Sequence, residues 1–185
     1  MNDQELLDMA IAFARPFHEA KQPGYFDDHV MAVVREVQKH TSNITVIIAA
    51  VFHDLVEDTD CTLAMILEKF GYAVMWFVQC LTDEPGKNRK ERKWKTYHKI
   101  RRDRFVLLIK LCDRLDNLRR CLRDAQARFS TMYLGEDLTF RSALWDPMDW
   151  QDVWAEYFDH IELMQRQVDR KRMAGPNHCG EIPLR

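Results

Sequence analysis

Residues 51–58, VFHDLVED, place an adjacent His-Asp pair and two further carboxylates in an otherwise apolar segment. On a helix that turns 100° per residue, four polar side chains share about 140° of arc: His53, Asp54, Glu57 and Asp58. The preceding residues 44–52 are apolar nearly all round, which predicts a buried helix. Burying unpartnered carboxylates costs several kcal/mol each, and a divalent cation is the simplest partner. The segment therefore predicts a metal site, although a polar helix end with surface acids is the simpler alternative.

A metal site of this kind needs a second imidazole and another carboxylate from elsewhere in the chain. His29 lies where a second helix is expected to begin, and the valines that follow it face one way. Asp113 follows the apolar run 105–112, with Lys110 one turn before it and Asn117 one turn after. Alone, His29 would be a capped or solvated histidine and Asp113 a salt-bridge partner, but together they supply the missing ligands.

The order of these residues resembles the ligand set of the HD-domain metal phosphohydrolases. Residues 53–60, HDLVEDTD, resemble the His-Asp-x-x-Glu-Asp-Thr motif of the hydrolase domain in RelA/SpoT-type alarmone enzymes. Residues 110–119, KLCDRLDNLR, resemble that family's Lys-Leu-Ala-Asp-Arg-Leu-x-Asn-x-Arg segment. Residues 81–84 and 90–93 are similar to two shorter family segments, so the resemblance extends over about residues 8–120. The stand-alone small alarmone hydrolases are the nearest comparison.

The resemblance implies an activity and a cofactor. It implies one Mn²⁺ held by four side chains: His29, His53, Asp54 and Asp113. Imidazole with carboxylate suits a mid-row divalent ion, whereas magnesium prefers all-oxygen shells. Glu57 and Asp58 are then expected to orient and deprotonate the attacking water, and Asn117 to contact the ribose or a phosphate. The implied reaction removes the 3′-pyrophosphate from (p)ppGpp-like alarmones.

The sequence departs from the family pattern in three places. The family carries an Arg-Lys pair, which helps to hold the guanine nucleotide, in a longer loop before the first ligand histidine; here the loop is the short 19–24, EAKQPG, with Lys21. Val30 replaces a proline, and Asp116 stands where the family has His or Tyr. Residues 121–148 carry no motif that we recognise. The base preference is therefore left open.

Basic residues are concentrated in one segment. Residues 87–104 hold ten basic side chains against two acidic ones, whereas the whole chain has a net charge of −2. Such a run is typical of a solvated helix face, but arginine forks also bind phosphate oxygens. We therefore predict four basic contacts to a nucleotide substrate: Lys21, Arg89, Arg92 and Lys93. A nucleic-acid groove is not expected, because no nucleic-acid module is recognisable and the net charge gives no general attraction to a polyanion.

The length and composition predict one all-α domain, an HD-domain helical bundle over residues 1–173 with a flexible tail at 174–185. No run approaches the roughly 20 apolar residues of a membrane span and no signal peptide is evident, so we expect a cytoplasmic protein with no membrane partner. The five cysteines are odd in number and lack paired spacing, which predicts free thiols. A homo-oligomer is possible. Predicted helices cover eight ranges: 6–19, 28–39, 44–55, 62–69, 72–81, 90–100, 103–122 and one beginning near 150.

The aromatic stripe of the last helix predicts core packing, although Tyr157 is also a candidate for contact with the nucleotide.

Two other interpretations of the function stay open at this point. The protein could be a phosphohydrolase for another nucleotide, either a nucleoside triphosphate or a 5′-monophosphate. It could also be a nucleotide sensor without turnover, but Glu57 and Asp58 argue against that, because a sensor has no evident need for both acids.

Overall fold

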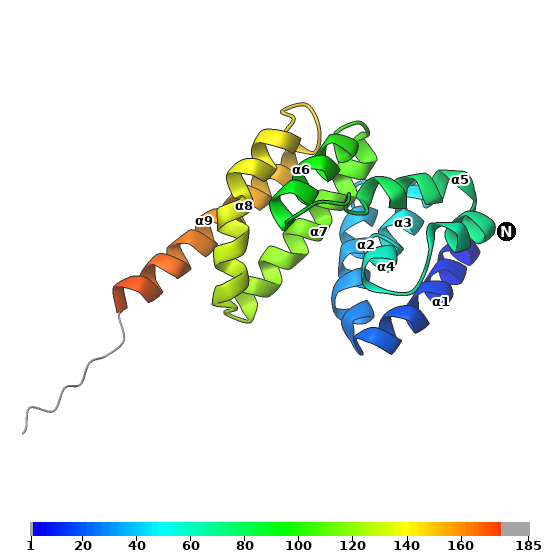
Figure 1. Cartoon of the computed structure of the whole chain (residues 1–185), viewed down its shortest axis with the longest axis horizontal. Helices are drawn as coiled ribbons and strands as arrows, with labels where there is room; N and C mark the ends of the chain where they lie inside the picture. The colour runs from blue at the N-terminus through cyan, green and yellow to red at the C-terminus, as the bar shows by residue number, and fades with distance from the viewer. Residues whose placement is uncertain (1, 175–185) are drawn as a thin grey trace, which may run out of the picture.

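The structure is a computed structural model and describes residues 2–174, all of whose regular elements are helical. This confirms the all-α prediction, and the predicted tail lies almost wholly outside the described residues. The elements are arranged as in Figure 1: α1 (Asp3–Lys21), a π-helical turn η1 (Phe26–Val30), α2 (Met31–Gln38), α3 (Ile44–Val51), α4 (Leu55–Asp58), α5 (Leu63–Leu81), α6 (Arg89–Ile100), α7 (Arg104–Arg123), α8 (Ala127–Leu144) and α9 (Gln151–Ala174).

Side-chain caps explain where several helices begin. The Asn43 side chain accepts a hydrogen bond from the Thr45 amide at 3.0 Å, and α3 starts there, as the sequence predicts. Thr62 caps α5 in the same way, and the Asp103 side chain accepts from the amides of Phe105 and Val106 at the start of α7. Each cap pairs backbone N–H groups that a helix start leaves without partners. These boundaries are therefore set by short polar residues in the sequence.

Helix α7 is the centre of the fold. It packs against α2 and α3 on one side and against α6, α8 and α9 on the other. Figure 1 shows α1 to α5 gathered at one end of the molecule and α6, α8 and α9 at the other. The run Leu107 to Cys112 is buried except at Lys110, so this part of α7 is apolar nearly all round. Asp113 follows this run and is thus placed deep in the molecule.

The predicted single helix over 44–55 is wrong, because the chain turns at residues 52–54. Helix α3 ends at Val51 and α4 begins at Leu55, whose amide bonds to the Phe52 carbonyl at 3.1 Å. A continuous helix would hold the side chains of His53 and Asp54 about 100° apart. The turn instead lets the two consecutive side chains reach the same point. Glu57 and Asp58 follow on the short helix α4.

Helix α5 is broken at Gly71, as the predicted pair of helices requires. Gly71 has φ 80° and ψ 175°, a conformation essentially restricted to glycine. By length and mean hydropathy (1.2) the 19-residue α5 could cross a membrane, contrary to the expectation that no run of the sequence is long and apolar enough. The break divides it into two shorter helices, neither near the roughly 20 residues of a span. The α5 helix also packs against α3, α6 and α7.

Helix α8 was not foreseen from the sequence. It runs through the unmatched segment 121–148 and packs against α6, α7 and α9. Only a few of its side chains are fully covered, among them Ser130, Phe140 and Leu144, so its apolar pattern is weak.

The prediction of free thiols is confirmed for the four cysteines that the structure describes, all of them buried: Cys61, Cys80, Cys112 and Cys121.

Candidate functional site

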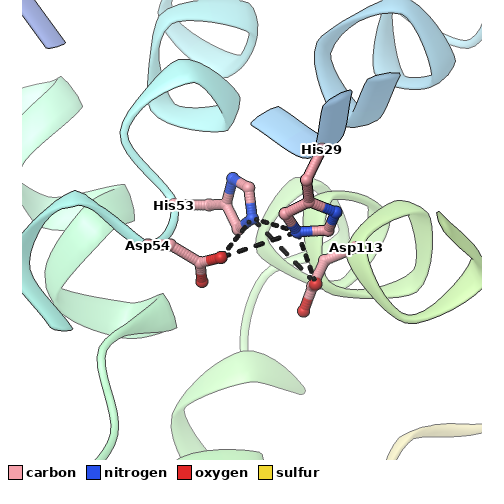
Figure 2. Close-up of side chains that lie close together, drawn as sticks. All are labelled: His29, His53, Asp54 and Asp113. Carbon is pink, nitrogen blue, oxygen red and sulfur yellow. Dashed lines mark hydrogen bonds and ion pairs between the residues drawn. The ribbon is translucent and has the colours of Figure 1, made fainter. Parts of the chain in front are cut away.

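Four side chains from three parts of the chain meet beside α7. One ligand atom from each lies within 4.8 Å of every other: His29, His53, Asp54 and Asp113. Figure 2 shows the two rings and two carboxylates turned toward one point, delivered by η1, by the turn after α3 and by α7. All four are ligands predicted from the sequence, and the fold brings them together.

Both imidazoles are oriented by hydrogen bonds on their Nδ1 atoms. His29 Nδ1 donates to Asp116 Oδ2 at 2.6 Å, and His53 Nδ1 donates to the Ala50 carbonyl at 2.8 Å. The two Nε2 atoms therefore face the cluster, 3.3 Å apart. A carboxylate or carbonyl behind a histidine is the usual arrangement that fixes the tautomer of a metal ligand.

The two carboxylates are also held in place. Asp54 Oδ2 accepts from the Tyr25 hydroxyl at 2.6 Å and lies 3.0 Å from His53 Nε2. Asp113 Oδ2 pairs with Lys110 Nζ at 2.7 Å, while Asp113 Oδ1 accepts from Asn117 Nδ2 at 2.6 Å. Asp113 Oδ1 is also 3.4 Å from His29 Nε2. Each carboxylate therefore presents one oxygen to the two imidazole Nε2 atoms.

The electrostatics of the cluster favour a bound cation. Burial lowers the pKa of His29, but its contacts with Asp113, Asp116 and Asp54 outweigh burial and raise the pKa to about 11. The pKa of His53 is also raised, because the Asp54 carboxylate outweighs burial. Burial opposes ionisation of Asp54, yet the two imidazoles hold its pKa well below the ordinary value. The donor set of two imidazoles and two carboxylates thus fits a divalent metal ion, which would take over the positive charge of these protons.

A cavity of about 220 Å³ opens beside the cluster, and eleven side chains line it: Tyr25, Asp54, Glu57, Asp58, Arg89, Lys93, Lys110, Asp113, Arg114, Asn117 and Tyr133. Both predicted catalytic acids and three of the predicted substrate contacts are among them. The cavity thus brings acidic and basic side chains from α4, α6 and α7, together with Tyr133 from α8, to one place.

Glu57 and Asp58 occupy different environments in this cavity. The Glu57 carboxylate accepts the backbone N–H of Asp83, which fixes its position. Desolvation raises the pKa of Glu57, opposed by Lys93 and Lys110. Desolvation, with the carboxylates of Asp54 and Glu57 nearby, raises the pKa of Asp58 to about 6. Asp58 is therefore poised to exchange a proton near neutral pH.

The basic helix α6 contributes two of its three predicted contacts to the cavity. Arg89 and Lys93 line it, and Lys93 Nζ also pairs with Asp83 Oδ1 at 2.9 Å. Arg92 is not among the lining residues, and its Nε lies 3.8 Å from Asp83 Oδ2. Asn117 lines the cavity, but its amide is already bonded to Asp113. The amide of Asn117 thus orients a cluster carboxylate in this structure.

Two predicted substrate contacts lie elsewhere. Lys21 pairs with Asp60, with Nζ 2.9 Å from Oδ2, and does not line the cavity. Tyr157 is buried in the core, where its ring packs against Phe140 and its hydroxyl donates to Asp137 at 2.7 Å. The suggested contact of Tyr157 with a nucleotide is therefore wrong in this structure, because the apolar stripe of α9 packs against α7 and α8.

Five residues of the site were not predicted as site residues: Tyr25, Lys110, Arg114, Asp116 and Tyr133. Tyr25 is four residues before His29 and Asp116 three after Asp113, so helical spacing could have identified both. Tyr133 comes from α8, whose sequence carries no motif that points to the site. Asp116, noted only as a departure from the family pattern, proves to be the partner of His29.

Comparisons with known proteins agree with this geometry. A family model described as the HD domain matches residues 10–134. The guanosine-3′,5′-bis(diphosphate) 3′-pyrophosphohydrolase of Aquifex aeolicus is 33% identical over 118 residues, covering 59% of this chain and 17% of the relative. The enzyme of the same name, MESH1, is 35% identical over 95 residues in Drosophila melanogaster and over 106 residues in Danio rerio. These alignments cover 50% and 55% of this chain, and 53% and 58% of the relatives.

The chain thus spans at most 58% of the length of these curated relatives, and only 17% of the Aquifex aeolicus protein. A solved structure, reported as a metazoan ortholog of SpoT that hydrolyses ppGpp, has a TM-score of 0.53 and 22% identity. It covers 94% of this chain and 95% of its own, and at this identity it supports the fold alone. The family model spans well over half of the sequence and contains all four cluster residues. With that match, the chain belongs to the HD domain family.

Proposed function

We propose that this protein is a metal-dependent phosphohydrolase that removes the 3′-pyrophosphate from guanosine 3′,5′-bis(diphosphate)-like nucleotides. One observation carries the proposal: four ligand atoms within 4.8 Å of one another adjoin a cavity that also holds two further acids and four basic side chains. Curated relatives at 33–36% identity carry the name of this activity, which agrees with the chemistry of the cavity.

The cofactor that we propose is one Mn²⁺ ion, held by the four residues of the cluster: His29, His53, Asp54 and Asp113. Two imidazoles with two carboxylates suit a mid-row divalent ion better than Mg²⁺. When bound, such an ion would polarise a phosphoryl oxygen and lower the pKa of water at the site. We assign proton transfer, orientation of the water and phosphate binding to the side chains around the ion.

Asp58 is the better candidate for the general base. Its pKa of about 6 leaves it ionised at neutral pH while keeping it close to the operating pH. Glu57 is tied to the Asp83 amide and is therefore suited to orienting the water. In the proposed reaction, water attacks the phosphorus attached to the ribose 3′ oxygen. The bond between this phosphorus and the 3′ oxygen breaks. Asp58 accepts a proton from the water and returns it to the departing 3′ oxygen, so the nucleoside leaves with a 3′ hydroxyl and the diphosphate leaves as pyrophosphate.

The basic side chains would hold the phosphate groups. Lys93 stands at the cavity wall near Asp83, and Lys110 is partly buried beside Asp113, so two lysines adjoin the acidic side chains of the cavity. Burial opposes the charge of Lys110, but Asp113 and Asp54 raise its pKa, so it remains a cation. Arg89 adds a guanidinium from the first turn of α6. A diphosphate arriving beside the metal ligands would meet charges of opposite sign.

A second candidate is hydrolysis of another nucleotide. The observation that favours it is the position of Lys21, which pairs with Asp60 and does not line the cavity. The loop that helps to hold guanine in related enzymes therefore supports no base contact here. We expect guanine to be preferred over adenine by less than about a hundredfold, or roughly 3 kcal/mol.

The test is a substrate panel assayed with Mn²⁺, in which released pyrophosphate and orthophosphate are measured separately. Guanosine and adenosine 3′,5′-bis(diphosphates), nucleoside triphosphates and 5′-monophosphates form the panel. Pyrophosphate release from a 3′-diphosphate, lost in Asp113→Ala, is the expected result. Hydrolysis of triphosphates or monophosphates without cleavage of any 3′-diphosphate would replace the proposal with the second candidate.

A further inference from the structure

A carboxylate from α8 holds two arginines at the edge of the cavity. Glu136 Oε1 accepts from Arg89 Nε at 2.5 Å, and Glu136 Oε2 accepts from Arg89 Nη2 at 3.3 Å. The same Oε2 accepts from both terminal nitrogens of Arg114 at 3.2 Å. Arg89 and Arg114 line the cavity beside the metal cluster. One carboxylate thus pairs with two of the four basic side chains there, and the three groups together keep one positive charge.

The guanidinium of Arg114 is fixed independently of this carboxylate. It is almost fully buried, and it lies 4.6 Å from the ring centroids of both Tyr133 and Phe140. The Tyr97 hydroxyl is a further contact, at 3.4 Å. Arg114 therefore keeps its position when its carboxylate partner changes. Such a preorganised guanidinium suits a phosphate group, because its fork matches phosphate oxygens as well as carboxylate oxygens.

Glu136 also stands at the boundary between two cavities. It lines a second cavity of about 330 Å³ between α6 and α8, which shares Arg89 and Lys93 with the cavity at the metal cluster. Burial alone would raise the pKa of Glu136, but its bonds to Arg89 and Arg114 outweigh burial and lower it, so the side chain is ionised. An anion that reaches from one cavity toward the other must compete with this carboxylate.

We propose that Glu136 is a specificity-determining residue, whose carboxylate occupies a two-arginine phosphate subsite formed by Arg89 and Arg114. The inference rests on the proposed function only in taking the ligand to be a polyphosphate. A terminal phosphate carries more charge than a carboxylate and can displace Glu136 from the arginines. A neutral hydroxyl at the same position cannot. Glu136 thereby lowers the affinity for ligands that carry a second phosphorylated arm away from the reacting bond and leaves ligands without that arm unaffected, so it sets how strongly the second arm is preferred.

The experiment uses the full chain, with metal content matched between variants and inorganic pyrophosphate as the probe. Glu136→Gln keeps the size of the side chain and an acceptor oxygen but removes the charge. We expect it to bind pyrophosphate about tenfold more tightly than wild type, equivalent to about 1.4 kcal/mol, with a steeper dependence on salt. The matched control is Glu162→Gln, which alters the net charge equally at an exposed i,i+4 pair on α9 and should change affinity less than twofold.

A double variant separates a local effect from a general one. If Glu136 acts through the arginines, most of its gain should vanish in an Arg89→Met background. An unchanged gain there, or equal gains in Glu136→Gln and Glu162→Gln, would overturn the proposal, as would weaker binding by Glu136→Gln. Should Glu136→Gln fail to fold, Glu136→Asp tests the same point, because the shorter carboxylate holds Arg89 less closely. It should still tighten binding about threefold, and no tightening would refute the role.

Turnover supplies a further readout. In Glu136→Gln, KM for a 3′,5′-bis(diphosphate) should fall several-fold with kcat within about twofold, while KM for a 3′-diphosphate without 5′ phosphates should not change. A fall in kcat alone would count against the role, because a residue that only masks a phosphate subsite acts on binding. If no 3′-diphosphate is hydrolysed, the proposed function fails, and pyrophosphate binding still decides the role of Glu136.

Discussion

Replacing Asp116 with alanine should weaken metal binding without removing any ligand. Asp116 Oδ2 accepts from His29 Nδ1 at 2.6 Å, and both side chains are buried, so water cannot easily replace the lost acceptor. Partners behind a ligand histidine contribute about 10- to 100-fold to metal affinity, equivalent to about 1.4–3 kcal/mol. We expect a loss of that size in Asp116→Ala. Asp116→Asn retains an acceptor oxygen and should lose less than about tenfold.

The assay is a Mn²⁺ titration against a competing chelator at fixed pH. Asp124→Ala is the control, because Asp124 lies at the end of the same helix, is exposed and pairs with the neighbouring Arg123, away from the metal cluster. Activity of Asp116→Ala should recover at high Mn²⁺ concentration, which a general folding defect would not allow. Wild-type affinity in Asp116→Ala, within twofold, would show that the Nδ1 contact does not orient His29, and the reasoning would fail.

Three further predictions follow from the site and the fold. The double variant Glu57→Gln with Asp58→Asn should keep its metal content but lose at least about a hundredfold in kcat; near-native turnover with normal metal content would make both acids structural. Because Asp58 must be ionised to accept a proton and its pKa is raised to about 6, kcat/KM should rise as pH increases through that region and level off above it. A bound cation would move this rise in kcat/KM to lower pH. If the rise persists in Asp58→Asn, it reflects the titration of another group. Gly71→Ala should destabilise the fold by about 1–3 kcal/mol, because alanine cannot adopt that conformation without strain. Gly135→Ala within α8 should stabilise it by about 0.5–1 kcal/mol, and chemical unfolding of the two variants measures both.

The ligand set was predictable because metal chemistry restricts both residue type and context. His29, Asp54 and Asp113 each follow or precede strongly apolar segments, so their burial could be inferred before any coordinates. The local backbone at His53 was not predictable in the same way. The apolar period continues through residues 52–55 without a proline or glycine, and nothing in it signals the turn that aims His53 and Asp54 at one point.

The contribution of α8 to the site had no sequence signal. Leu138 is exposed, whereas the polar Ser130 is buried, so burial along α8 does not follow an apolar stripe. The helix is instead joined to the rest of the molecule partly through Glu136, which binds Arg89 and Arg114. Pairing between positions 22 and 47 residues apart cannot be read from local periodicity. The residues most specific to this chain were thus the hardest to foresee.

The metal cluster exchanges a proton when it binds a cation. Asp54 and Asp113 are held ionised, because the imidazoles and Lys110 lower their pKa values against burial. The pKa of His29 is raised to about 11, so this imidazole carries a second proton at neutral pH in the absence of metal, and the Asp54 carboxylate also raises the pKa of His53. A divalent ion held by His29 would replace that proton. Metal affinity should therefore increase with pH, because the proton becomes easier to displace.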